Sequence, residues 1–164
     1  MIGFQDEKWV DLLPKTERCW TPNGKTRYIQ TLGYTKRVNC FITLFWPHKR
    51  IVWNTFPRRR NIEFRIHLGN IVAYANRNEF KRVILFVDHA SYHETDEVKL
   101  YVEQHPVLRV IWLGKKDPNS NPTECQVNKR LSSAVSVNRE YIDLEDLKQK
   151  TKIFLRKYNS IYAT

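Results

Sequence analysis

The chain has 164 residues, a length that fits one domain and allows a substantial core to be buried. A hydrophobic content of 41% excludes a disordered chain, and no run approaches the roughly 20 apolar residues that span a bilayer. The formal charge of +11 indicates a polyanionic partner but does not distinguish DNA from RNA, anionic lipid or ribosome.

The three cysteines say more about the redox state of the protein's compartment than about a metal site. Cys19, Cys40 and Cys125 lie far apart and form no Cys-x-x-Cys pair. This pattern argues for a reducing compartment and against a zinc knuckle. The N-terminus is acidic and patterned as a strand, unlike a signal peptide, so we expect a cytoplasmic protein that makes no contact with a membrane.

The first third of the chain predicts three strands. Residues 2–7 form a short apolar strand that ends in acid at Asp6, and residues 8–26 are expected to be irregular because prolines interrupt them. Residues 37–45 and 51–56 read as two strands of a hairpin with a Pro-containing turn. Three side chains of the irregular segment are expected to pack onto the sheet: Trp9, Cys19 and Trp20.

A basic run precedes the first predicted helix. Arg58, Arg59 and Arg60 form either a solvated loop or a contact with nucleic acid. Residues 61–76 follow with apolar side chains at spacings near three and four, which predicts a crossover helix that Gly69 weakens. The predicted inner stripe is Ile62, Ile66, Ile71 or Leu68, and Ala75.

Residues 83–87, Val-Ile-Leu-Phe-Val, predict a strand buried on both faces that ends at Asp88. The carboxyl ends of parallel strands are where α/β folds place their chemistry, but an Asp before a helix is also a common N-cap. A helix over residues 94–104, with Val98, Tyr101 and Val102 facing inward, and a strand over residues 107–113 follow.

A third acid, Glu124, lies in Asn121-Pro-Thr-Glu124 at the start of a predicted helix. Asn121 suits an N-cap, and Glu124 occupies the position from which a capping-box Glu reaches back to the cap. A structural role therefore competes with a catalytic one. The last predicted helix spans residues 141–158, with Leu144, Leu147, Phe154 and Tyr158 as its apolar stripe.

The order strand-Asp, strand-Asp, helix-Glu resembles that of the DDE transposases, more narrowly the mariner-like superfamily and its prokaryotic insertion-sequence branch. The resemblance rests on Phe4-Gln-Asp-Glu7, on Leu85-Phe-Val-Asp-His-Ala-Ser-Tyr-His93 and on Asn121-Pro-Thr-Glu124 followed by Lys129. His89 departs from the family's usual Asn. Family members usually carry helix-turn-helix modules upstream, so we expect residues 1–164 to be a single catalytic domain without its DNA reader.

The resemblance implies an α/β, ribonuclease H-like fold: a five-stranded mixed sheet, three antiparallel and then two parallel strands, flanked by helices. It also implies that Asp6, Asp88 and Glu124 hold two Mg²⁺ or Mn²⁺ ions, with Asp6 bridging them and each of the other acids on one ion. Carboxylate oxygens favour such hard cations. The implied activity is DNA cleavage and strand transfer at transposon ends and target DNA, in the cytoplasm and at the nucleoid.

Other residues have supporting roles in this hypothesis. His93, Asn121 and Lys129 order the site or touch DNA, whereas a zinc site made by His89 and His93 is not expected. The basic residues Arg58, Arg59, Arg60, Lys115 and Lys116 are expected to contact phosphates without reading bases. A homodimer and a separate helix-turn-helix protein are possible partners. The alternatives are a non-catalytic nucleic-acid-binding remnant of an insertion element and a ribonuclease H-like nuclease.

Overall fold

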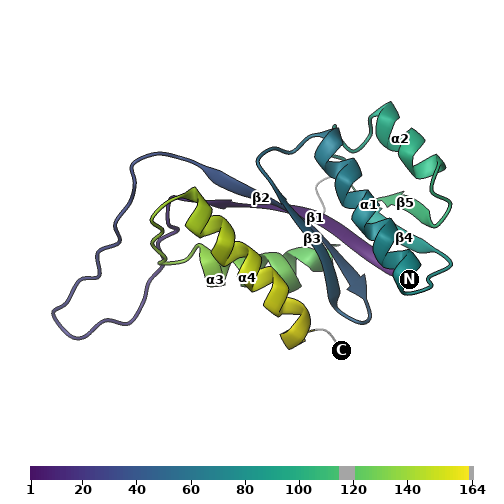
Figure 1. Ribbon diagram of the computed structural model, residues 1–164. Coiled ribbons are helices and arrows are strands. Elements are labelled where there is room, and N and C mark those ends of the chain that lie inside the picture. The colour runs from purple at the N-terminus through teal and green to yellow at the C-terminus, as the bar shows by residue number, and fades with distance from the viewer. Residues whose placement is uncertain (115–120, 163–164) are drawn as a thin grey trace.

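The computed structural model describes residues 1–114 and 121–162, and its centre is a five-stranded sheet (Figure 1). The strands are β1 (Ile2–Asp11), β2 (Arg37–Trp46), β3 (Arg50–Phe56), β4 (Val83–Val87) and β5 (Leu108–Trp112). Their order in the sheet is β3-β2-β1-β4-β5. β1, β2 and β3 pair antiparallel, while β4 pairs parallel with β1 and β5 with β4, as expected.

The first strand is longer than predicted. β1 pairs with β2 along its whole length, from Ile2 opposite Trp46 to Asp11 opposite Arg37. Residues 8–11 are therefore a strand, stabilised by the ladder to β2 and by burial of Val10. β1 thereby extends past the end of β4, because only residues 2–4 pair with that strand.

The segment between β1 and β2 does not pack as predicted. Trp9 is 44% exposed, and Cys19 and Trp20 are exposed as well. Cys19 and Trp20 belong to the loop between β1 and β2, which extends away from the sheet in Figure 1, whereas Trp9 belongs to β1 and has Arg37 and Arg59 over its ring. The first part of this loop is held by Asn138. The side chain of Asn138 accepts a hydrogen bond from the N–H of Glu17 and donates one to the carbonyl of Glu17.

Helices cover both faces of the sheet (Figure 1). On one face lie α1 (Asn61–Arg77) and α2 (Asp96–Glu103), whose core includes Phe64, Leu68 and Leu85. On the other lie η2 (Glu124–Asn128), a π-helical turn, then α3 (Lys129–Val135) and α4 (Leu144–Tyr162), whose core includes Leu131 and Leu155. None of the described helices is long and apolar enough to cross a membrane.

The predicted inner stripe of α1 is confirmed at Leu68, Ile71 and Ala75, which are buried, but is wrong at its start. Ile62 and Ile66 are about half exposed, whereas Glu63 and His67 are buried. These polar residues are satisfied by partners elsewhere: Glu63 pairs with Arg60, and His67 bonds the side chains of Thr43 and Asn54. Gly69 suits the packing of α1 on α2, because a Cβ there would lie 3.2 Å from the hydroxyl of Tyr101.

The last helix closes the far end of the sheet. Leu147 and Tyr158 of α4 are buried as predicted, with Leu144 and Phe154 packed at the margin of the same core. Asn159 also bonds the edge strand β3, since its side chain accepts from the N–H of Ile51 at 2.7 Å and donates to the carbonyl of Ile51 at 3.0 Å. It takes the place of a neighbouring strand at that edge.

Candidate metal centre

Asp6 and Glu124 are brought together by one amide. Asp6 lies on β1 and points to the face covered by η2, where the side chain of Asn128 donates to its Oδ2 at 2.7 Å. The same Asn128 Nδ2 donates to Oε2 of Glu124 at 2.9 Å. Asn128 is fully buried, so this amide fixes the separation of the two carboxylates.

The helix that carries Glu124 is fastened to the backbone of β1. Asn121 is buried, and its side chain donates to the carbonyl of Gln5 while accepting from the N–H of Thr123, as an N-cap does. The hydroxyl of Thr123 donates to the carbonyl of Phe4 at 2.7 Å. Among the described residues, no bond runs from Glu124 back to the N–H of Asn121, so its carboxylate serves the Asn128 bridge instead of a capping box.

Asp88 follows directly after β4, and its side chain is half exposed at the rim of the sheet. Its Oδ1 accepts from the N–H of Ala90 at 3.2 Å and from Nδ1 of His93 at 2.9 Å. α2 begins only at Asp96, after Thr95, so Asp88 is not the N-cap of that helix.

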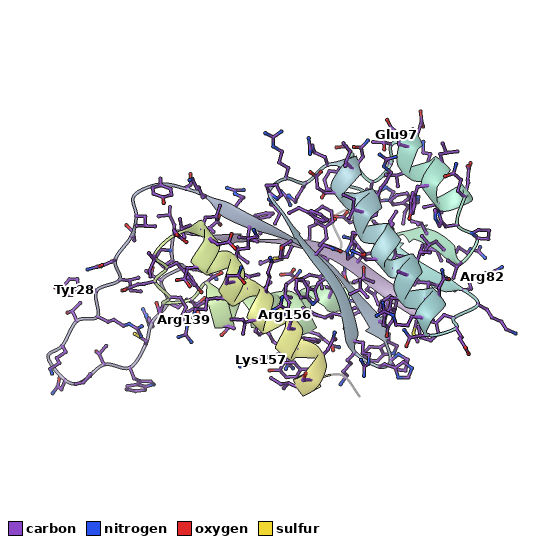
Figure 2. All side chains as sticks on the ribbon, viewed as in Figure 1. Tyr28, Arg82, Glu97, Arg139, Arg156 and Lys157 are labelled. Carbon is purple, nitrogen blue, oxygen red and sulfur yellow. The ribbon has the colours of Figure 1, made fainter. Side chains whose placement is uncertain are left out.

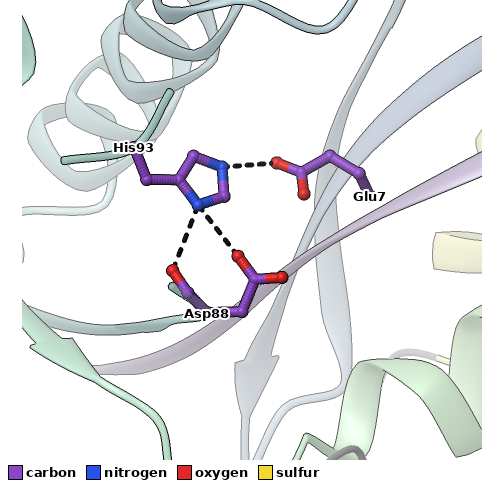
Figure 3. Close-up of side chains that lie close together, drawn as sticks. All are labelled: Glu7, Asp88 and His93. Atoms are coloured by element: carbon purple, nitrogen blue, oxygen red, sulfur yellow. Dashed lines mark hydrogen bonds and ion pairs between the residues drawn. The ribbon is translucent and has the colours of Figure 1, made fainter. Parts of the chain in front are cut away.

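His93 joins Asp88 to a second acid of β1 (Figure 3). Its ring is fully buried, and Nε2 lies 2.8 Å from Oε1 of Glu7. Glu7 follows Asp6 in the strand, so its side chain points to the opposite face, toward α1. One ligand atom from each of Glu7, Asp88 and His93 lies within 4.8 Å of the others, which is within reach of a shared cation.

The electrostatics of the site follow from this crowding of acids. Burial, and then the neighbouring charges of Glu7, Glu124 and Asp88, raise the pKa of Asp6 to about 7. The hydrogen bond from His93 lowers the pKa of Asp88. Burial would lower the pKa of His93, but the bonds to Asp88 and Glu7 outweigh it and raise that pKa to about 9. Both ring nitrogens then carry protons, which suits two acceptor carboxylates.

Asn128 links Asp6 to Glu124, whereas Asp88 is joined through His93 to Glu7. Among the described residues, the group whose ligand atoms all lie within 4.8 Å of one another is Glu7, Asp88 and His93, not the predicted set of Asp6, Asp88 and Glu124. Sequence reasoning did not assign roles to Glu7 and Asn128. The signal for Asn128 was its position four residues after Glu124, which places both on one side of a helix. Glu7 had no such signal, because its contact with His93 joins residues 86 positions apart.

The predicted basic contacts are dispersed. Arg58 is exposed, Arg59 lies over the ring of Trp9 at 4.7 Å, and Arg60 is paired with Glu63. Lys129 is exposed at the start of α3, whereas Lys115 and Lys116 lie outside the described residues. Figure 2 shows further basic side chains on separate parts of the fold: Arg82, Arg139, Arg156 and Lys157.

His89 and His93 do not form a joint site. His89 stacks on Trp112, and its Nδ1 lies 2.6 Å from Oε1 of Glu94. His93 instead faces Glu7 and Asp88.

Comparisons with known proteins place this geometry in a family. A family model described as DDE superfamily endonuclease matches residues 1–148. A search of curated proteins found no significant match.

Solved structures share the fold at low sequence identity. The mariner Mos1 paired-end complex with Mg is 17% identical with a TM-score of 0.72, and covers 94% of this chain and 47% of that one. The Mos1 paired-end complex with the left transposon end is 16% identical with a TM-score of 0.69, and covers 97% and 52%. This chain thus spans about half the length of these two.

A shorter structure aligns over more of its own length. The Mos1 transposase catalytic domain with raltegravir and Mn is 15% identical with a TM-score of 0.64, and covers 97% of this chain and 78% of that one. The match to the family model extends over most of the sequence, and the TM-scores of 0.64 to 0.72 show that the solved structures share the fold. The chain therefore belongs to the DDE superfamily endonucleases and has the ribonuclease H-like fold of the Mos1 catalytic domain.

Proposed function

We propose that this chain is the catalytic domain of a DNA transposase from the prokaryotic insertion-sequence branch of the mariner-like superfamily. In this function it cleaves DNA strands at the ends of a mobile element and joins them to target DNA. Asp6, Asp88 and Glu124 hold two Mg²⁺ or Mn²⁺ ions for both reactions. Solved relatives with the same fold include complexes with Mg and with Mn, which supports this choice of cation.

The observation that carries the proposal is a group of acids whose one cationic partner among the described residues is His93, which pairs with Asp88. Within residues 1–114 and 121–162, no Lys or Arg forms a salt bridge with Asp6, Glu124 or Asp88. The raised pKa of Asp6 records how unfavourable its charge is in this setting. A divalent cation would relieve that repulsion, and the all-carboxylate oxygen set fits Mg²⁺ and Mn²⁺.

Each acid has a part that follows from its position. The charges of both Glu124 and Asp88 act on Asp6, which supports Asp6 as the residue that bridges two ions. Asp88 offers the oxygen that His93 does not hold, and Glu124 is fixed by Asn128. When bound, two such ions activate the attacking oxygen and stabilise the leaving oxygen of a phosphodiester.

The partners follow from charge and from the family. A net charge of +11 with dispersed basic side chains suits a DNA backbone, and relatives were solved as transposon-end and strand-transfer complexes. A helix-turn-helix protein could supply sequence recognition, and a homodimer would pair two element ends. This function places the chain in the cytoplasm, at the nucleoid.

A nicking assay tests the proposal. We expect the protein to nick supercoiled DNA with Mg²⁺ or Mn²⁺ and not with EDTA, and Asp88→Asn to abolish nicking while the fold is retained. Asp96→Asn is the matched control, because Asp96 is fully exposed at the start of α2. Equal nicking by wild type and Asp88→Asn would reveal a contaminant, and absence of nicking on any metal would indicate a non-catalytic remnant.

A further inference from the structure

The side chain of Glu7 is linked to the proposed metal ligand Asp88 through the imidazole of His93. We propose that Glu7 is a positioning residue, which acts through His93 to fix the carboxylate of Asp88 for metal binding. The inference rests on the proposed function, since it concerns how the same metal centre is organised. It gives Glu7 and Asp6 different roles, although the two are neighbours in the sequence: Asp6 binds metal, and Glu7 positions another ligand.

The first step of the argument is that Asp88 needs an external support. It lies beyond the last residue of β4, and its side chain is 52% exposed, so the strand alone does not fix its rotamer. Among the described residues, only its Oδ1 accepts hydrogen bonds, from His93 and from Ala90. Oδ2 is thereby directed away from His93 and left for a cation (Figure 3).

The second step is that His93 is itself held firmly. Its ring lies between Phe64, at a centroid distance of 4.1 Å, and Tyr92, at 4.4 Å. Nδ1 also lies 3.2 Å from the carbonyl oxygen of Asp88, and the backbone N–H of His93 donates a hydrogen bond to the carbonyl of Ala90. Packing restricts the ring plane, and in the described part of the chain Glu7 is the one residue that bonds Nε2.

The third step is that Glu7 is a fixed anchor. Its side chain is 4% exposed, and Oε1 accepts from His93 at 2.8 Å and from the side chain of Gln5 at 2.7 Å. It stands on the face of β1 opposite Asp6, Asn128 and Glu124. The ring of His93 stands between Glu7 and Asp88 in Figure 3, so Glu7 reaches the metal centre through that ring.

The test is a thermodynamic cycle on Mn²⁺ binding, measured by calorimetry on the metal-free protein. Outer partners of metal ligands typically change affinity by about 10- to 100-fold. We expect Glu7→Gln and His93→Gln each to weaken Mn²⁺ binding about tenfold or more. The double variant should bind about as tightly as His93→Gln alone, because the hydrogen-bonded link from Glu7 to Asp88 runs through His93.

Controls separate the possible failures. Asp11→Asn, which makes the same charge change at the far end of β1, should bind Mn²⁺ like the wild type. If Asp88→Asn binds Mn²⁺ normally, the proposed function fails. If only Glu7→Gln binds normally, or if the two effects multiply in the double variant, the positioning role is overturned and the metal centre stands.

A second variant serves if His93→Gln does not fold. Glu7→Asp keeps the negative charge but withdraws it by one methylene, beyond contact with His93. We expect it to weaken Mn²⁺ binding about as much as Glu7→Gln does. Wild-type affinity in Glu7→Asp would show that charge alone matters and would overturn the inference.

Discussion

Removing the charge of Asp6 should stabilise the metal-free protein. Burial and three neighbouring carboxylates raise the pKa of Asp6 from an ordinary value of 3.8 to about 7. Each pKa unit corresponds to about 1.4 kcal/mol, so the ionised side chain costs up to about 4 kcal/mol above pH 7. Asp6→Asn removes this cost and loses one hydrogen bond from Asn128 to a charged group, worth about 1.5–3 kcal/mol. We expect a net gain of about 2 kcal/mol at pH 8.

The gain should depend on pH in a defined direction. The folded state keeps the proton of Asp6 up to about pH 7, whereas the unfolded chain releases it near pH 3.8. Stability of the wild type therefore falls as pH rises between these values, and the advantage of Asp6→Asn grows over the same window. Below about pH 4 the advantage should vanish, because both states of the wild type are then protonated.

Urea unfolding with EDTA at several pH values measures this difference. Asp11→Asn is the control: it removes an acid from the same strand, one that is partly exposed and paired with Arg37 at 3.4 Å, and should cost at most about 1 kcal/mol. Added Mn²⁺ should stabilise the wild type and leave Asp6→Asn unchanged. A variant no more stable than the wild type at pH 8, or a gain that does not vary with pH, would refute the reasoning.

Three further changes have expected outcomes. Asn128→Asp places another carboxylate between Asp6 and Glu124 and should lower the free energy of unfolding of the metal-free protein by about 2 kcal/mol. Addition of Mn²⁺ should restore the lost stability. A loss that Mn²⁺ does not reduce would contradict the bridging role of Asn128. Asn159→Ala removes two bonds to Ile51 and should cost about 1–3 kcal/mol in thermal unfolding, whereas the exposed Ile161→Ala should cost less. DNA binding should weaken with salt at a slope of about −0.9 per phosphate and vary little between duplexes, and Arg58→Ala should reduce the slope by about 1 in gel shifts; a strong preference that survives high salt would reveal a base-reading element.

The strands and the three acids were predictable because they depend on local patterns. Residues 83–87 are an apolar run that ends at Asp88, and Asn121 to Glu124 is a helix start, so both acids could be placed at the ends of elements. Their meeting with Asp6 followed from the family resemblance, which set the strand order. The structure links Asp6 to Glu124 through Asn128 and Asp88 to Glu7 through His93, so a common site for the three acids stays a prediction.

What sequence patterns missed depends on contacts between distant residues. The inner face of α1 contains Glu63 and His67, which look like surface residues until Arg60, Thr43 and Asn54 are in place. The last part of β1 carries Lys8 and Asp11 beside the buried Val10, so only its pairing with β2 identifies it as a strand. The partnership of Glu7 with His93 likewise requires the register of two strands and a loop.

The most direct test of the central claim is the position of bound manganese. Crystals grown or soaked with Mn²⁺ can be measured at a wavelength where manganese scatters anomalously. We expect anomalous peaks in contact with Asp6, shared with Asp88 on one side and Glu124 on the other, and Glu7 outside the coordination sphere. A peak bound by Glu7 and His93 without Asp6, or no peak near the three acids at saturating Mn²⁺, would contradict the account.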